Sequence, residues 1–213
     1  LKDGNVLVKV DYSSLNFKDA LILKDGGRIV RKFPFVPGID FSGIVESSDD
    51  SNFKKGDRVI LTGFRVGEVF FGGFSQYAKV SSEFLVKAPD GLSNKHAMML
   101  GTAGLTALLC AFAIKAKEDL LLGSKVKDVL VTGATGGVGS VAVMVLSKMG
   151  YKVHAVTGKK DKSDYLKDLG AQNIIDRKEF AGESKLLEKG VWDGVVDTVG
   201  GEELTKILAQ TNP

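Results

Sequence analysis

Val129–Gly139 reads VLVTGATGGVG and decides the fold. A short β-branched run ends there in a Gly-rich turn, and an apolar helix is expected over about residues 140–148. In a six-residue register the turn is Ala134-x-Gly136-x-x-Gly139, and a second apolar run follows at 152–156. An ordinary Gly-rich turn is the alternative, but the flanking strands and helix favour a βαβ unit. The pattern therefore predicts backbone N–H groups that hold a dinucleotide pyrophosphate at the start of the helix.

Composition limits the possible classes of protein. The chain has 213 residues, of which 44% are hydrophobic and 26% charged, enough for one large domain or two modest ones. A net charge of +3 does not predict a nucleic-acid or membrane-surface partner. The single cysteine, Cys110, rules out an internal disulfide framework, and its apolar surroundings predict a buried thiol. No secretory signal opens the sequence, so a cytoplasmic protein is expected.

The first part of the chain predicts a small barrel-like β domain over about residues 1–95, because short strands alternate with turn signals. Gly43 lies inside one of these strands, as a bulge or a close backbone approach would require. Ser14 or Asn16 is expected to cap a short helix. The strands are expected at residues 6–10, 39–46, 58–62, 76–80 and 84–87.

After Pro89, helices alternate with strands expected at 129–132, 152–156, 173–175 and 193–197. This alternation predicts a parallel sheet covered on both faces. Ser93 is expected to cap a helix, and the uncharged run 97–114 predicts a buried helix from near Leu100 or Thr102 rather than a membrane span. The six-stranded form of this fold needs two further strands, so a C-terminally truncated chain is expected. The first residue is not Met, so a missing N-terminus is expected too.

The end of the second parallel strand indicates which cofactor is bound. An NAD site places an acidic residue there, whereas this chain continues Thr157-Gly158-Lys159-Lys160-Asp161-Lys162. Thr157, Lys159 and Lys162 are therefore predicted to bind the 2′-phosphate of NADPH, with a solvated basic turn as the alternative. Arg177 follows the third strand and could reach the same phosphate or the adenine.

Several stretches together resemble the medium-chain dehydrogenase/reductase superfamily, in its zinc-independent quinone-reductase-like branch. Within that branch the sequence is most similar to the acrylyl-CoA reductase (YhdH/AcuI) family. Besides the Gly-rich turn, the matching stretches are residues 13–20, 37–43, 61–63, 101–107, 169–171, 191–193 and 197–200.

The resemblance implies a GroES-like catalytic domain over residues 1–100 and a Rossmann NADPH-binding domain over residues 101–213, in a homodimer. It also implies transfer of hydride from NADPH to the activated C=C bond of a small 2-enoyl thioester such as acryloyl-CoA. Lys159 stands where relatives commonly carry arginine. By the resemblance, the pyrophosphate would be held by Thr135, Gly136, Gly137 and Val138, and the 2′-phosphate by Thr157, Gly158 and Lys159.

Candidate catalytic residues lie near the start of the first helix. Such a reaction needs donors that stabilise an enolate, and the Asn16 amide, Lys18 and backbone N–H groups of residues 63–73 are candidates. Phe17 stands where relatives often carry tyrosine near the nicotinamide, so here it would be an apolar wall. Thr102 and Thr106, one turn apart, could face the nicotinamide carboxamide. Each of these polar groups could instead be a cap, a surface group or a bond within its own helix.

Aromatic residues in the loop at 63–73 have two interpretations. Phe64, Phe70 and Phe71 could cover an acyl chain, or they could be core aromatics of the β domain.

A metal site is not expected. A catalytic zinc needs about three ligands, and the chain has one cysteine and two histidines, His96 and His154, both interpreted as structural. By the resemblance, Gly38-Ile39-Asp40 stands where zinc alcohol dehydrogenases usually have Gly-His-Glu. Two other functions stay open: an NADPH-dependent quinone or 2-enal reductase, and an NADPH-binding protein without reductase activity. A nucleic-acid role is disfavoured by the balanced charge.

Overall fold

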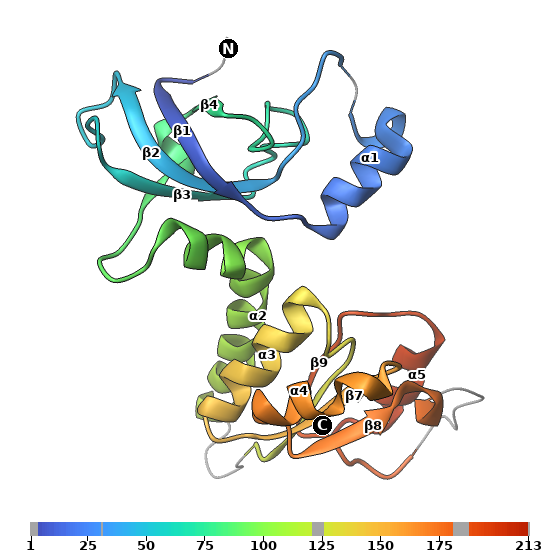
Figure 1. Cartoon of the computed structure of the whole chain (residues 1–213). Coiled ribbons are helices and arrows are strands. Elements are labelled where there is room, and N and C mark those ends of the chain that lie inside the picture. The colour runs from blue at the N-terminus through green and yellow to red at the C-terminus, as the bar shows by residue number, and fades with distance from the viewer. Residues whose placement is uncertain (1–3, 31, 121–125, 181–187, 213) are drawn as a thin grey trace. The chain divides into compact units, whose positions relative to one another are not determined.

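The computed structural model describes residues 4–30, 32–120, 126–180 and 188–212 (Figure 1). The chain divides into two compact units, residues 1–102 and 103–213. The long helix α2 (Asn94–Leu120) runs from the first unit into the second.

The first unit is built on an antiparallel sheet with the strand order β4-β1-β2-β3-β5 (Figure 1). Its buried apolar side chains, including Val8, Phe41 and Leu61, form one core cluster. The prediction of a small β domain in this part of the chain is confirmed. The elements are β1 (Val6–Ser13), α1 (Phe17–Ile29), β2 (Asp40–Ser48), β3 (Arg58–Thr62), β4 (Tyr77–Val80), η1 (Ser82–Phe84) and β5 (Val86–Lys87).

Gly43 has the close backbone approach that its place in a strand suggested. A Cβ atom at this position would lie 2.2 Å from the carbonyl oxygen of Lys9 on β1. Gly43 pairs with Val10, and the β1–β2 register slips between Val10 and Tyr12. The strand β2 therefore continues through Gly43, and the irregularity lies in the partner strand.

The second unit contains a parallel sheet with the strand order β8-β7-β6-β9. Successive residues of β6 face opposite sides, because Val129 and Val131 belong to one core cluster and Leu130 to another. Residues of α2, α3 and α4 share the first cluster, and Ile207 of α5 belongs to the second. The predicted parallel Rossmann-like sheet is confirmed. Its elements are β6 (Asp128–Val131), α3 (Gly137–Lys148), β7 (Lys152–Thr157), η2 (Lys160–Lys162), α4 (Ser163–Asp168), β8 (Asn173–Asp176), η3 (Arg177–Phe180), β9 (Gly194–Val196) and α5 (Glu202–Ala209).

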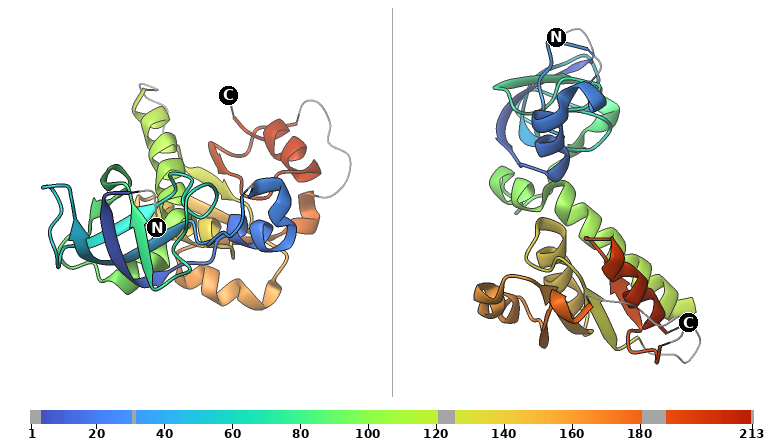
Figure 2. Two further views of the ribbon diagram at one scale, coloured as in Figure 1. Left: turned by 90° about the horizontal axis from the view of Figure 1, so that it is seen from above. Right: turned by 90° about the vertical axis from the view of Figure 1, so that its right-hand side faces the viewer.

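The helix α2 contains both predicted helices, one capped at Ser93 and one beginning near Leu100 or Thr102, but the second is buried on only part of its surface. Ser93 caps the start of α2, as predicted, since the Ser93 Oγ atom accepts the N–H of His96 at 3.2 Å. Gly101 then breaks the helix with φ 49° and ψ −152°. The part of α2 that follows is the long green helix in Figure 2. Ala107 and Ala111 are fully buried, whereas Leu109 is 61% exposed. Ala107 and Ala111 thus face the core, whereas Leu109 faces outward.

By length and composition alone, α2 is the one helix among the described residues that could cross a membrane. Core helices of globular proteins meet the same criterion. The break at Gly101 and the burial of Ala107 and Ala111 in the core cluster favour a core helix. Cys110 is only partly buried against the same cluster, so the prediction of a buried thiol was wrong in degree.

Candidate functional site

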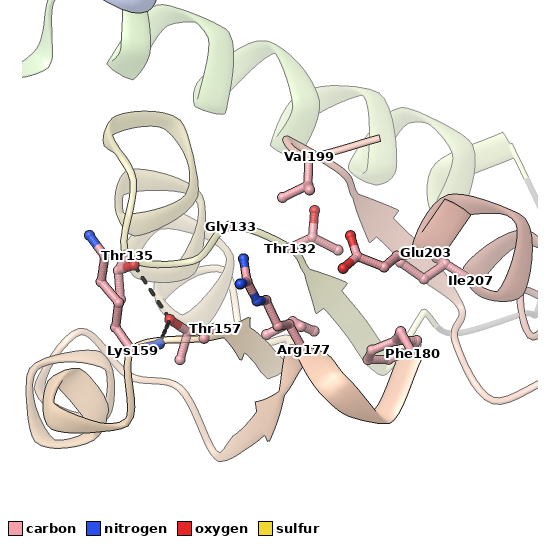
Figure 3. A pocket seen from close by; sticks show the side chains of 12 residues that line it. Thr132, Gly133, Thr135, Thr157, Lys159, Arg177, Phe180, Val199, Glu203 and Ile207 are labelled. Atoms are coloured by element: carbon pink, nitrogen blue, oxygen red, sulfur yellow. Dashed lines mark hydrogen bonds between the residues drawn. The ribbon is translucent and has the colours of Figure 1, made fainter. Parts of the chain in front are cut away.

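A pocket of about 310 Å³ opens where the carboxyl ends of the parallel strands meet (Figure 3). This edge of an open α/β sheet is where ligands bind, because the loops that follow the strands diverge there. Four strands contribute residues directly or through the loop that follows them. The lining residues are Thr132, Gly133, Thr135, Val156, Thr157, Gly158, Lys159, Arg177, Phe180, Val199, Glu203 and Ile207.

The Gly-rich turn packs too tightly for side chains at two positions. At Gly133, where φ is +55°, an added Cβ would lie 2.3 Å from Thr198 Oγ1. At Gly139 an added Cβ would lie 2.4 Å from the carbonyl oxygen of Gly133. Gly139 therefore lets the first turn of α3 lie directly against the end of β6, which is the spacing a dinucleotide-binding turn requires.

Among the described residues, no side chain caps the start of α3. Gly136 is the N-cap, with φ −82° and ψ 175°, and α3 begins at Gly137, three residues earlier than predicted. Glycine has no side chain with which to cap the helix, and first-turn N–H groups have no partner within a helix. These N–H groups and the positive end of the helix dipole fit the negative charge of a pyrophosphate.

Thr132, which follows β6, forms hydrogen bonds with the residues that follow β9, beside the Gly-rich turn. Its hydroxyl donates to Asp197 Oδ1 at 2.5 Å and accepts the N–H of Thr198 at 2.9 Å. Thr198 Oγ1 donates back to the Thr132 carbonyl oxygen at 3.0 Å. The Asp197–Gly200 stretch was one of those that carried the resemblance, but the sequence assigned it no role. Sequence reasoning also missed the lining residues Phe180, Val199 and Glu203, which lie far from the Gly-rich turn in the sequence.

The end of β7 supplies a polar rim with two cations. Thr157 is buried, and its Oγ1 atom accepts the N–H of Lys159 at 3.0 Å and lies 3.5 Å from Thr135 Oγ1. An added Cβ at Gly158 would lie 2.8 Å from Arg177 Nε, so the arginine side chain rests on the glycine. Lys159 and Arg177 extend from the strand ends toward the Gly-rich turn (Figure 3). Two cations beside a buried hydroxyl suit a phosphate group.

The other predicted cofactor-binding residues do not line this pocket. Lys162 lies in η2, where its Nζ atom is 3.4 Å from Asp161 Oδ2. Gly136, Gly137, Val138 and Gly139 lie in the adjoining turn and the start of α3. Thr102 donates its N–H to Asp40 Oδ2 at 2.8 Å, and Thr106 lies farther along α2.

In the first unit, Asp40 gathers polar groups around a fully buried carboxylate. It accepts Ser14 Oγ at 2.6 Å, Asn16 Nδ2 at 3.1 Å and the Thr102 N–H at 2.8 Å. Because Gly101 breaks α2, a new helical segment begins at Thr102. The Asp40 carboxylate, which is distant in the sequence, accepts an N–H at the start of this segment and so caps it. The described groups that donate to the Asp40 carboxylate are all uncharged. Asp40 therefore fixes the orientation of the Asn16 amide.

Asp19 is a second fully buried carboxylate with a structural role. It accepts the N–H of Asn16 at 2.9 Å and those of Gly38 and Ile39 at 3.1 Å. Asn16 thus occupies the N-cap position of α1, as predicted, but its side chain turns to Asp40 instead of capping the helix.

Lys18 and Phe17 lie on the exposed start of α1. Lys18 Nζ is 3.1 Å from Glu68 Oε2, a contact that holds the pKa of Glu68 below its usual value. Arg65 Nη2 lies 3.4 Å from the other oxygen of Glu68. Phe17 is 81% exposed. The predicted catalytic trio therefore comprises a fixed amide, an exposed ring and an ion-paired ammonium group.

Phe64, Phe70 and Phe71 were predicted to be either a cover over an acyl chain or core aromatics, and they differ in burial. Phe70 packs against the core cluster, and its ring centroid lies 5.6 Å from that of Phe84. Phe64 stacks on Phe84 at 4.9 Å but is 53% exposed, and Phe71 meets Phe35 edge-on at 6.4 Å. Phe70 is thus a core residue, and Phe64 and Phe71 form part of the surface.

Both ring nitrogens of His154 contact neighbouring side chains. His154 Nε2 lies 2.7 Å from Asp128 Oδ1, and its Nδ1 atom faces the Asn173 amide nitrogen at 3.1 Å. Since an amide N–H donates, Nδ1 accepts and Nε2 carries the proton in the neutral ring. The described residues include no group of three or more His, Cys, Asp or Glu placed to hold a metal ion.

Two known families match the chain, one within each of its two units. Residues 2–90 match the family "Alcohol dehydrogenase GroES-like domain", and residues 137–213 match the family "Zinc-binding dehydrogenase". The chain is 50% identical to probable acrylyl-CoA reductase AcuI of Escherichia coli over 212 residues, covering 100% of the chain and 64% of the relative. It is 51% identical to acrylyl-CoA reductase AcuI of Ruegeria pomeroyi over 208 residues, covering 97% of the chain and 62% of the relative.

A solved structure agrees with these relatives. The yhdH oxidoreductase of Salmonella enterica, in complex with NADP, superposes with a TM-score of 0.92 at 50% identity, over 100% of this chain and 64% of that one. The chain thus spans a little under two thirds of the length of the proteins it matches. With both parts matched and the parallel sheet and Gly-rich turn in place, the chain belongs to the medium-chain dehydrogenase/reductase superfamily, among its quinone-oxidoreductase-like members.

Proposed function

We propose that the chain binds NADPH in the pocket at the carboxyl ends of β6, β7, β8 and β9. The observation that carries the proposal is the position of Thr157, Lys159 and Arg177 around one rim of that pocket. A carboxylate at the end of β7 would accept the ribose 2′-hydroxyl of NAD, whereas a buried threonine hydroxyl ends this strand. The Salmonella relative was solved in complex with NADP, which supports the same cofactor here.

The chain's own groups divide the cofactor between them. Thr135 and the N–H groups of Gly137, Val138 and Gly139 hold the pyrophosphate at the start of α3. Gly136 leaves room beside it, and its own N–H donates to the Gly133 carbonyl oxygen at 2.8 Å. Thr157, Gly158 and Lys159 hold the 2′-phosphate, and Arg177 covers the adenosine. Lys162 pairs with Asp161 and is given no contact with the cofactor. Thr102 and Thr106 are assigned to the nicotinamide carboxamide.

The proposed reaction is reduction of the activated C=C bond of a small 2-enoyl thioester such as acryloyl-CoA. NADPH, when bound, would supply a hydride equivalent to the electron-poor β-carbon, the enolate charge would rest on the thioester oxygen, and the α-carbon would then take a proton from solvent. The protein must hold the thioester oxygen with donors and keep water from the reacting carbon during hydride transfer. Asn16, oriented by Asp40, and Lys18, countered by Glu68, are proposed as those donors, with Phe17 as an apolar wall. Both AcuI relatives support this substrate class.

The test compares oxidants for NADPH under matched conditions. NADPH oxidation is followed at equal concentrations of acryloyl-CoA, a simple 2-enal and a benzoquinone. We expect kcat/KM for acryloyl-CoA to exceed that of the enal at least tenfold. Equal turnover with the enal would contradict the thioester assignment, and no oxidation by any of the three would support an NADPH-binding protein without reductase activity.

Quinone reduction is the second candidate. Quinone oxidoreductases of Sus scrofa and Homo sapiens are each 30% identical to the chain, over 97% and 98% of it respectively. Near Asn16 in the sequence, Lys18 pairs with Glu68 at 3.1 Å, and Arg65 pairs with the same carboxylate at 3.4 Å, so both cations have a carboxylate partner. A substrate without the phosphates of coenzyme A therefore fits this surface equally well.

We also propose a cytoplasmic homodimer with a small-molecule substrate and with no nucleic-acid or membrane partner. The single cysteine and the net charge of +3 support this assignment. Light scattering on the purified protein gives the oligomeric state directly, and a mass equal to one chain would contradict the dimer.

A further inference from the structure

Next to the proposed 2′-phosphate site lies an ion pair that has no part in the proposed function. Lys160 Nζ is 3.1 Å from Asp176 Oδ2. The pair joins η2, which follows β7, to the end of the neighbouring strand β8. Both residues line a second pocket of about 290 Å³, and Thr157 lines this pocket and the proposed NADPH pocket. Thr157 is therefore the residue that the pocket of the ion pair shares with the proposed phosphate site.

Backbone pairing places Asp176 beside the phosphate site. Asp176 is the register partner of Thr157 across the parallel β7–β8 ladder, about 4.8 Å away in backbone terms. The next residue, Arg177, lines the NADPH pocket. A carboxylate in this position lies within a Debye length of a 2′-phosphate bound at Thr157 and Lys159.

The Asp176 carboxylate is ionised at neutral pH. Its Oδ1 atom accepts the N–H of Lys178 at 3.0 Å. This backbone hydrogen bond, together with the contact from Lys160, holds the pKa of Asp176 below its usual value. Without Lys160 the carboxylate would keep its charge and repel a dianion nearby, because like charges at such distances raise the energy of the bound state.

We propose that Lys160 is a positioning residue for cofactor choice: by neutralising Asp176 it lets the pocket accept the 2′-phosphate of NADPH. The inference rests on the proposed function and extends it to a residue outside the NADPH pocket. Lys159 is assigned direct contact with the phosphate, whereas Lys160 acts through Asp176. The pair thus sets the ratio of NADPH to NADH affinity without touching either nucleotide.

The chain offers a matched control in the same turn. Lys162 pairs with Asp161 at 3.4 Å and lines neither pocket, so Lys162→Ala removes the same charge from η2 without exposing Asp176. Dissociation constants for NADPH and NADH are measured on the full chain by fluorescence titration at low and at high salt. The variants are Lys160→Ala, Lys160→Arg, Asp176→Asn, the double variant Lys160→Ala/Asp176→Asn, and Lys162→Ala.

Lys160→Ala should weaken NADPH binding about three- to tenfold at low salt and leave NADH binding within about twofold. High salt should remove most of this effect, since it screens exposed charges. Lys160→Arg should keep the wild-type ratio, and the double variant should return to it because the uncompensated carboxylate is gone. Lys162→Ala should have less than half the effect of Lys160→Ala.

Two results would overturn the inference. Equal losses in Lys160→Ala and Lys162→Ala would mean that only total charge matters. A double variant as weak as Lys160→Ala would mean that Lys160 contacts the phosphate directly. Failure of the proposed function gives a different result, because wild-type protein would then bind NADPH no better than NADH and Lys159→Glu would change neither affinity.

Discussion

Gly139→Ala tests whether the Gly-rich turn is held by backbone contact. The added Cβ would lie 2.4 Å from the Gly133 carbonyl oxygen and 2.8 Å from Ala134 Cα, and neither atom can turn aside as a side chain would. Overpacking of this kind costs about 3 kcal/mol, and the better helix propensity of alanine returns about 1 kcal/mol. The net loss is about 2 kcal/mol, which lowers the melting temperature of a domain this size by about 5 to 10 °C.

The assay uses the single tryptophan of the chain. Trp192 is 7% exposed in the core of the second unit, so its fluorescence reports the unfolding of that unit. Gly136→Ala is the matched control in the same turn, because its Cβ would lie 3.2 Å from the same oxygen and its φ of −82° suits alanine. We expect a loss below about 1 kcal/mol there, from the poorer N-cap. Equal losses in the two variants would refute the close-packing argument.

Three further predictions concern the second unit. Lys159→Glu should weaken NADPH binding at least about 30-fold and NADH binding only slightly, measured by fluorescence titration, since a charge-assisted contact becomes a repulsion. Thr132→Val should lower the stability of the second unit by about 1–2 kcal/mol in denaturant titrations, because Asp197 and the Thr198 N–H lose their hydrogen bonds to the buried Thr132 hydroxyl. Thr135→Val is its control and should cost less than about 0.5 kcal/mol, because the one contact given for its hydroxyl is 3.5 Å long. Burial raises the pKa of Asp193, but the N–H groups of Asp128 and Lys127 and the Asn212 amide outweigh it and hold this pKa below 3.8. Asp193→Asn should therefore lower the free energy of unfolding by about 1 kcal/mol above pH 4, and this difference should shrink as the pH falls below 3.8. A difference that stays constant across the acid range would contradict the lowered pKa.

The parts of the fold that sequence predicted well are those with a local cause. The β6 strand and the turn after it were predictable because a β-branched run and glycines at fixed spacing constrain the backbone within about ten residues. The cap at Ser93 was predictable for the same reason. The predicted helix start near Leu100 or Thr102 agrees with the break at Gly101. The exposed face of α2 was not predictable, because a uniformly apolar sequence has no periodicity to show which face would meet the core.

The parts of the site that sequence missed depend on partners far away in the chain. Asp40 becomes an organising carboxylate because Ser14 lies 26 residues before it and Thr102 lies 62 residues after it. Thr132 and Asp197 meet across 65 residues. Among the lysines after β7, charge alone could not separate Lys159 from Lys162, since the turn geometry of η2 decides which one lines the pocket.

The two groups of candidate residues are held by different physics, and this predicts how variants will behave. The proposed NADPH pocket has a rim made of a buried threonine, a glycine contact and exposed cations, so single charge changes there should alter Kd while the fold survives. Asn16 is instead fixed by the fully buried carboxylate of Asp40, whose loss would leave several donors unpaired. Buried polar networks with uncharged partners fail as a unit, because each orphaned group keeps its desolvation cost. Cofactor preference should therefore respond gradually to mutation, whereas changes near Asn16 should disturb orientation and stability together.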